Sequence, residues 1–139
     1  MRKKCRWNRF VAASALALAA IMGGCKGAPA YQGSQRDVLA TYKVRRLTAD
    51  LPPTIRVPAA VAAGKGALLS RGYAIKAASM TEDSGHIEGA PADPGILESI
   101  WIDIRQTSSG TRVRIIAEPL GNQVKSRAIL DAMLSQLGL

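Results

Sequence analysis

Residues 99–118 read SIWIDIRQTSSGTRVRIIAE, and this stretch decides the fold. Apolar and polar residues alternate on both sides of a Ser-Ser-Gly turn signal, which is typical of two strands joined by a hairpin. One face of this pair collects the apolar residues Ile100, Ile102, Ile104, Val113 and Ile115. The opposite face collects Trp101, Asp103, Arg105, Arg112, Arg114 and Ile116. The alternation predicts a sheet with one buried face and one polar face.

Two further segments carry apolar residues at helical spacing. The apolar positions are Val57, Val61 and Leu68 in residues 55–71, and Leu130, Met133, Leu134 and Leu137 in residues 123–137. Proline is tolerated in a first helical turn, so the first helix is expected to start near Pro58 and to end at Gly72. The second is expected to run from an N-cap at Asn122 to a stop at Gly138. Ser126 is expected to lie off its apolar stripe.

The remaining segments predict additional strands. Residues 41–51 are expected to form one strand, which Pro52 and Pro53 terminate. Residues 73–80 form a second, residues 82–85 a turn, and residues 86–89 a short returning strand. Two amphipathic helices and a sheet with one apolar face bury each other's apolar surface if both helices cover that face. The prediction is an α+β two-layer sandwich, with a mostly antiparallel sheet of about four to five strands and two helices on one face.

The chain opens with a targeting segment. Five cations precede an uncharged stretch of 13 residues, Phe10 to Met22. A membrane span needs about 20 apolar residues, so this stretch is interpreted as the core of a signal peptide. It ends in Ile21-Met22-Gly23-Gly24-Cys25, which resembles the bacterial lipobox. That resemblance implies cleavage after Gly24 and acylation of Cys25.

Three parts of the chain follow from this interpretation. Residues 1–24 are the lipoprotein signal peptide, residues 25–37 a flexible tether rich in Gly, Ser and Pro, and residues 38–139 a single α+β domain. After cleavage the formal charge is 14 − 10 = +4, because five of the 19 cations are removed. The expected location is the bacterial cell envelope, on its periplasmic side. Lys26 replaces the Asp that retains enteric lipoproteins at the inner membrane, which favours the outer membrane.

The mature part resembles the small bacterial lipoproteins of domain-of-unknown-function family 3568. The resemblance covers roughly residues 40–137, and its motifs are the lipobox, Leu-Leu-Ser-Arg-Gly-Tyr at residues 68–73 and Ser-Arg-Ala-Ile-Leu-Asp-Ala-Met-Leu at residues 126–134. This family implies a lipid-anchored protein and supplies no activity or catalytic residues to transfer.

The inventory of reactive residues is small. Cys25 is the one cysteine after residue 24, and His86 is the one histidine of the chain. Disulfide scaffolds and zinc clusters are therefore excluded, and no cofactor or metal is expected. Glu82, Asp83, His86 and Glu88 surround the predicted turn and offer an alternative function, a small periplasmic hydrolase or metal-dependent enzyme. Turns favour such polar residues in any case, so a solvated turn is the preferred interpretation.

The polar sheet face is the best candidate for a function. Trp101, Arg105, Arg112 and Arg114 are expected to share it, and guanidinium groups bind carboxylates and phosphates and stack on aromatic rings. The expected function is non-enzymatic binding of an envelope protein or an anionic envelope component, with membrane attachment through the lipid. An ordinary solvated face is the alternative interpretation. Nucleic acid is not expected as a partner in this compartment.

Overall fold

A computed structural model of the chain describes residues 31–32, 38–93 and 97–139. Its elements are β1 (Tyr31–Gln32), β2 (Leu39–Lys43), β3 (Arg46–Leu51), α1 (Val57–Ser70), β4 (Tyr73–Met80), β5 (Ser84–Pro91), β6 (Ser99–Thr107), β7 (Gly110–Glu118) and α2 (Gln123–Gln136). The strands form one open antiparallel sheet in the order β1-β2-β3-β7-β6-β5-β4. The α+β class is confirmed. The predicted four to five strands are too few, because six strands of five or more residues and the two-residue β1 are present.

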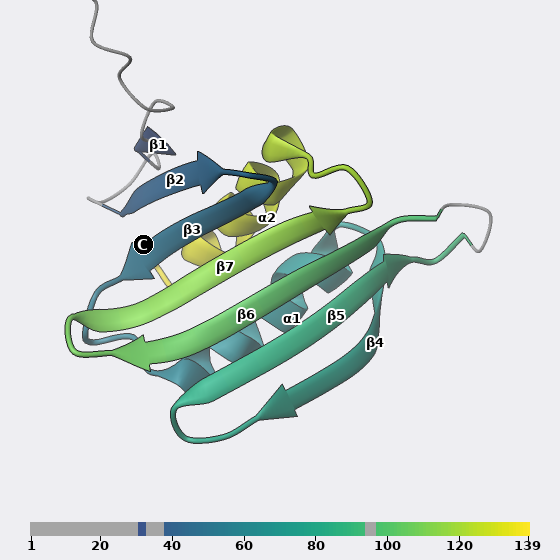
Figure 1. The fold of residues 1–139 in the computed structure, drawn as a ribbon. Coiled ribbons are helices and arrows are strands. Elements are labelled where there is room, and N and C mark those ends of the chain that lie inside the picture. Colours follow the sequence, from purple (N-terminus) through teal and green to yellow (C-terminus); the bar gives the residue numbers. More distant parts are fainter. Residues whose placement is uncertain (1–30, 33–37, 94–96) are drawn as a thin grey trace, which may run out of the picture.

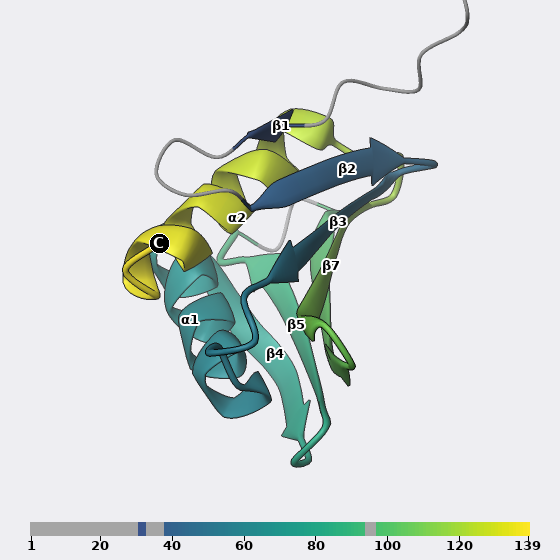
Figure 2. The ribbon, with the colours of Figure 1, turned by 90° about the vertical axis from the view of Figure 1, so that its left-hand side faces the viewer.

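Both helices lie on the same face of the sheet (Figure 1). α1 packs on β4, β5 and β6, α2 packs on β7 and β3, and the helices pack against each other. Figure 2, which turns the molecule by 90°, shows the two layers, with no helix on the far side of the sheet. The described part of the chain therefore forms two layers and leaves one sheet face open.

The buried face of β6 and β7 is the one that the alternation predicts. Ile100, Ile102 and Ile104 are fully buried, and Val113 and Ile115 are each 1% exposed. Their neighbours in β3 and β5, Leu47, Ala49, Leu51 and Ile87, continue the same apolar layer. The layer removes apolar surface from water beneath both helices, which is the main favourable contribution to folding.

Of the two glycines in the helix α1, Gly64 lies where the helix is close to the sheet. Gly64 is buried, and a methyl group added there would lie 2.8 Å from Cδ1 of Ile87 on β5. Val57, Val61 and Leu68 are buried around it as predicted. The low helix propensity of glycine is thus offset by tight helix-to-sheet packing. At the helix end, Gly72 adopts a positive φ of 79°, as the predicted stop requires.

The helix α2 begins at its predicted cap. The Asn122 side chain accepts a hydrogen bond of 3.0 Å from the backbone N–H of Lys125. Leu130, Met133 and Leu134 are buried as predicted. The placement of Ser126 off the apolar stripe is wrong, since this residue is fully buried. It lies four residues before Leu130, one helical turn away on the same face, and is therefore buried with that face.

The interpretation of residues 41–51 as a single strand is also wrong. The chain reverses at Val44 and Arg45, so that β2 and β3 form a hairpin in which Lys43 pairs with Arg46. Both turn residues have positive φ, 48° for Val44 and 64° for Arg45. Two-residue hairpin turns of this kind favour Asn and Gly, and neither residue is present to mark the turn in the sequence.

The predicted strand at residues 73–80 matches β4, whereas the strand predicted at residues 86–89 is longer. β5 begins at Ser84 and continues to Pro91. Gly85, Ile87 and Gly89 face the helices, and Ser84, His86 and Glu88 alternate with them on the open face. Tyr31 and Gln32, within the segment expected to be a tether, pair with β2.

Truncation of a buried α2 residue should destabilise the domain. Leu130 is 1% exposed, and a buried Leu→Ala change costs about 2 to 5 kcal/mol because it leaves a cavity. We expect Leu130→Ala to lower the free energy of unfolding by that amount in urea denaturation. Val124→Ala, on the same helix but 77% exposed, is the control and should change it little. Equal effects of the two substitutions would contradict the docking of α2.

Candidate functional site

The open sheet face is organised in rows that cross the strands. Thr48 of β3 lies opposite Arg114 of β7, which lies opposite Asp103 of β6, and Asp103 lies opposite His86 of β5. The two neighbouring rows are Asp50, Arg112, Arg105 and Ser84 on one side, and Arg46, Ile116, Trp101 and Glu88 on the other. Cross-strand neighbours of this kind are about 5 Å apart at Cβ, so their side chains interact directly.

Arg112 is held by a carboxylate across the strand pair. Its Nε donates to Oδ1 of Asp50 over 2.6 Å, and its Nη2 donates to Oδ2 over 3.2 Å. This hydrogen bonding and the negative charge of Asp50 raise the pKa of Arg112. The two-point geometry shows how a planar guanidinium on this face binds a planar anion.

His86 and Trp101 form a second cluster. Nδ1 of His86 lies 2.7 Å from Oδ1 of Asp103, and the His86 ring centre lies 5.2 Å from that of Trp101 at a tilt of 46°. The indole N–H of Trp101 donates to Oγ of Ser99 over 3.0 Å. These contacts fix the orientation of Trp101, which is half-buried on the open face.

Three arginines surround a hollow of about 110 Å³ at the β6–β7 hairpin end of this face. The lining residues of this arginine hollow are Asp103, Arg105, Gln106, Thr107, Arg112 and Arg114. Within residues 38–93 and 97–139, neither Arg105 nor Arg114 forms a hydrogen bond or ion pair with another side chain, and the Asp103 carboxylate contacts His86. Two guanidinium groups are therefore free to bind an added anion.

The four residues predicted to form a binding surface do share the open face, but they divide into two groups. Arg105, Arg112 and Arg114 line the arginine hollow. Trp101 does not line it and belongs to the neighbouring row, in contact with His86. The arrangement is suited to bind a carboxylate or phosphate at the arginines, with an aromatic surface beside it.

Asp50 is a residue of this site that the sequence reasoning missed. Its carboxylate accepts two hydrogen bonds from Arg112, one of the three arginines of the hollow. The alternation of Arg46, Thr48 and Asp50 predicts that Asp50 lies on the open face, because alternate residues of a strand face the same side. This prediction requires that β3 is recognised as a separate strand.

The residues of the alternative site around residues 82–88 do not converge on one point. Glu82 and Asp83 lie at the β4–β5 turn, whereas His86 and Glu88 project from the open face of β5. No group of three or more His, Cys, Asp and Glu side chains that could hold a metal occurs in the described part of the chain. The metal-dependent interpretation therefore gains no support from the geometry of these residues.

The strand register brings a serine opposite His86. Ser79 of β4 pairs with His86, which pairs with Asp103, so that Ser, His and Asp lie in order across three strands. A nucleophile of this type needs a hydrogen bond from serine to histidine. The hydrogen bonds of the described residues include none between Ser79 and His86, and we interpret the His86–Asp103 pair as a link between β5 and β6.

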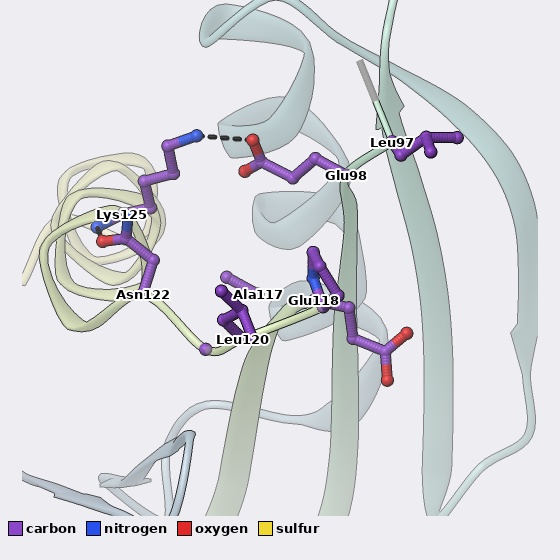
Figure 3. Close-up of a pocket in the computed structure, with 9 residues that line it drawn as sticks. Leu97, Glu98, Ala117, Glu118, Leu120, Asn122 and Lys125 are labelled. Atoms are coloured by element: carbon purple, nitrogen blue, oxygen red, sulfur yellow. Dashed lines mark hydrogen bonds and ion pairs between the residues drawn. The ribbon is translucent and has the colours of Figure 1, made fainter.

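A second pocket, of about 210 Å³, lies at the other end of the sheet (Figure 3) and was not anticipated from sequence. Its lining comes from the segment before β6, the end of β7, the β7–α2 loop and the first turn of α2, including Leu97, Glu98, Leu120 and Lys125. Nζ of Lys125 reaches across it to Oε2 of Glu98, and the Tyr73 hydroxyl donates to Oε1 over 3.1 Å. Hydrogen bonding to Glu98 raises the pKa of Lys125, and burial together with the charge of Glu98 raises the pKa of Tyr73. The Glu98 carboxylate is thus occupied, and the pocket combines the apolar Leu97 and Leu120 with the exposed Glu118.

The predicted signal peptide and the acylation site at Cys25 lie outside the described residues. No helix among those described is long and apolar enough to cross a membrane. Comparison of the chain with protein-family models and with curated protein sequences finds no match. The resemblance to domain-of-unknown-function family 3568 therefore stays a prediction.

Removal of the Glu98 carboxylate should weaken the junction of β4, β6 and α2. Its side chain is 14% exposed and accepts from both Lys125 and Tyr73, so Glu98→Ala leaves two donors without their partner. We expect a loss of about 1 kcal/mol in the free energy of unfolding, measured in urea. Glu118→Ala removes another carboxylate from the same pocket, one that is exposed, and should have a much smaller effect. A smaller loss for Glu98→Ala than for Glu118→Ala would contradict this description.

Proposed function

We propose that this chain is a lipid-anchored protein of the bacterial cell envelope that binds an anionic group of a partner through the arginine hollow. The main support for this proposal is that Arg105, Arg112 and Arg114 line one hollow of the open face. Two of these guanidinium groups have no side-chain partner within the described ranges.

The size and chemistry of the hollow favour a small planar or tetrahedral anion. A hollow of about 110 Å³ has room for a carboxylate or a phosphate group. Guanidinium groups bind both anions through paired N–H donors, as the Asp50 carboxylate already does at Arg112. The ligand is accordingly a charged group of an envelope protein or of an anionic envelope component, bound without chemical conversion. Nucleic acid is not part of this proposal.

The lipid anchor is supported by the sequence alone. The basic segment, the short apolar stretch and the lipobox at Cys25 together favour export and acylation. Several acyl chains give stable membrane attachment, whereas a single chain holds reversibly. The proposed location is the periplasmic side of a membrane, the outer membrane where one exists, in line with the suggested lipoprotein family.

Substitution of the acylation site tests the anchor. We expect the full chain with Cys25→Ser to be recovered without acyl groups and to leave the membrane fraction, because the thiol is the acceptor of the lipid. The measurements are mass spectrometry of the mature N-terminus and fractionation of the envelope. Wild-type protein with an unmodified Cys25, or with cleavage at another position, would refute the lipoprotein proposal.

Substitutions in the hollow test anion binding. With inorganic phosphate as the probe, we expect Arg105→Ala with Arg114→Ala to weaken binding about tenfold or more in calorimetry, since two charged donors are lost. Asp50→Asn should strengthen binding, because it releases Arg112 from its carboxylate partner. Added salt should weaken wild-type binding by screening.

Arg46→Ala is the matched control, because Arg46 lies on the same open face but outside the hollow. It should leave phosphate binding nearly unchanged. An equal loss with Arg46→Ala and with the double substitution would show that the face attracts anions only through its general charge, and the hollow would then not be a site.

A further inference from the structure

Exposed apolar side chains gather at the end of the molecule opposite the arginine hollow. Val44 is 83% exposed in the β2–β3 turn, Leu120 is 76% exposed in the β7–α2 loop, and Leu97 is 92% exposed before β6. Val124, in the first turn of α2, is 77% exposed. Figure 1 shows the β2–β3 turn, the end of β7 and the start of β6 at one end of the sheet. We refer to Val44, Leu97, Leu120 and Val124 as the apolar end.

Direct contacts join the parts of this end. Nη1 of Arg45 donates to the backbone carbonyl of Pro119 over 3.4 Å. Gly121 has a positive φ of 78°, and a methyl group added there would lie 2.5 Å from Cβ of Arg45. Leu97 and Leu120 line one pocket. The hairpin turn and the two loops therefore form one continuous surface.

The conformation of Val44 is unfavourable for folding alone. It has a φ of 48°, in the left-handed region that β-branched residues avoid, and its side chain gains little burial. A turn selected only for stability carries Asn or Gly at this position. Backbone strain combined with a protruding apolar side chain is typical of functional positions rather than of structural ones.

Cations surround the protruding valine. Lys43, Arg45 and Arg46 are its nearest neighbours along the chain, and residues 39–48 contain no acidic residue. At the same end, the Glu98 carboxylate is occupied by Lys125 and Tyr73. The exposed Glu118 also lies at this end, where the three cations around Val44 outnumber it. Exposed apolar side chains beside an excess of Lys and Arg are typical of a surface that inserts into the interface of an anionic bilayer.

The direction of β1 brings the chain to this end. β1 is antiparallel to β2, with Tyr31 opposite Ala40 and Gln32 opposite Leu39, so Tyr31 is the end of β1 nearer the β2–β3 turn. Cys25 lies six residues earlier, and six residues span at most about 20 Å. An acyl group on Cys25 and the apolar end can thus reach the same membrane surface.

We infer that the apolar end docks on an anionic lipid bilayer, with Val44 and Leu120 in the interface and Lys43, Arg45 and Arg46 at the headgroups. The inference rests on the proposed location at a membrane and is independent of the arginine hollow. β6 begins at the apolar end and reaches the hollow at Gln106 and Thr107, so docking directs the hollow away from the lipid.

The experiment uses the chain from residue 25 onward with Cys25→Ser, which contains every described residue and carries no lipid. Its sedimentation is measured with vesicles of phosphatidylcholine alone and with vesicles that also contain phosphatidylglycerol. Binding is expected with the anionic vesicles. Each Lys or Arg near such a surface raises binding about fivefold, so Lys43→Gln with Arg46→Gln should weaken it about 25-fold.

Two pairs of serine substitutions separate the apolar end from other exposed apolar residues. Val44→Ser with Leu120→Ser should weaken binding about tenfold or more, because both side chains leave water on docking. Leu39→Ser with Met80→Ser is the control, since these residues are 62% and 55% exposed at other positions, and binding should be retained. Thermal unfolding of each variant verifies that it is folded.

Three results would overturn the inference: no binding to anionic vesicles, equal loss in both serine pairs, or loss with Arg105→Ala and Arg114→Ala instead. The last result would place the membrane at the open sheet face. Because the test protein cannot be acylated, none of these results depends on whether Cys25 is the lipid anchor, which the mass of the mature N-terminus decides separately.

Discussion

Burial of one sheet face under two helices determines which side chains the opposite face presents. Along β5, β6 and β7 alternate residues are buried, so each apolar residue that faces α1 or α2 sends its neighbour to the opposite side. Ile102 and Ile104 thereby place Asp103 and Arg105 outside, and Val113 places Arg112 and Arg114 there. The arginine hollow is a direct consequence of core packing, and a shift of one residue in register would bury its charges.

Strand alternation places the arginines on the open face, and pairing with carboxylates decides which of their charges remain free. Asp50 occupies Arg112, and Asp103 contacts His86, so the free positive charge of the hollow lies on Arg105 and Arg114. A side chain that is already hydrogen-bonded to a carboxylate must exchange that partner to bind a ligand. The face is therefore less cationic than its arginine content suggests, and the hollow brings together two guanidinium groups that no described carboxylate occupies.

The sequence predicted the helices and the central hairpin well because their signals are local. Asn122 caps α2, Gly72 follows α1, and the isoleucines of β6 alternate without interruption. The β2–β3 turn was missed because Val44 and Arg45 adopt a conformation that their residue types disfavour. Ser126 is polar, but its position one helical turn before Leu130 outweighs its polarity and places it in the core.

The functional residues could be predicted only in part, because strand periodicity is a local signal whereas contacts between distant residues are not. The common face of Arg105, Arg112 and Arg114 follows from strand periodicity, which is visible along the chain. The partner of Arg112 is 62 residues distant in sequence, and the link between Arg45 and Pro119 joins residues 74 apart. Such contacts depend on strand order, which composition and periodicity leave open.

The Nε–H signals of the arginines show directly whether the open sheet face presents a defined arginine site. In a nuclear magnetic resonance titration of the unsubstituted mature protein with inorganic phosphate, the signals of Arg105 and Arg114 should shift together in a saturable manner, while that of Arg46 stays in place. Uniform shifts of all exposed arginines, or shifts that do not saturate, would show that the face has no defined anion site.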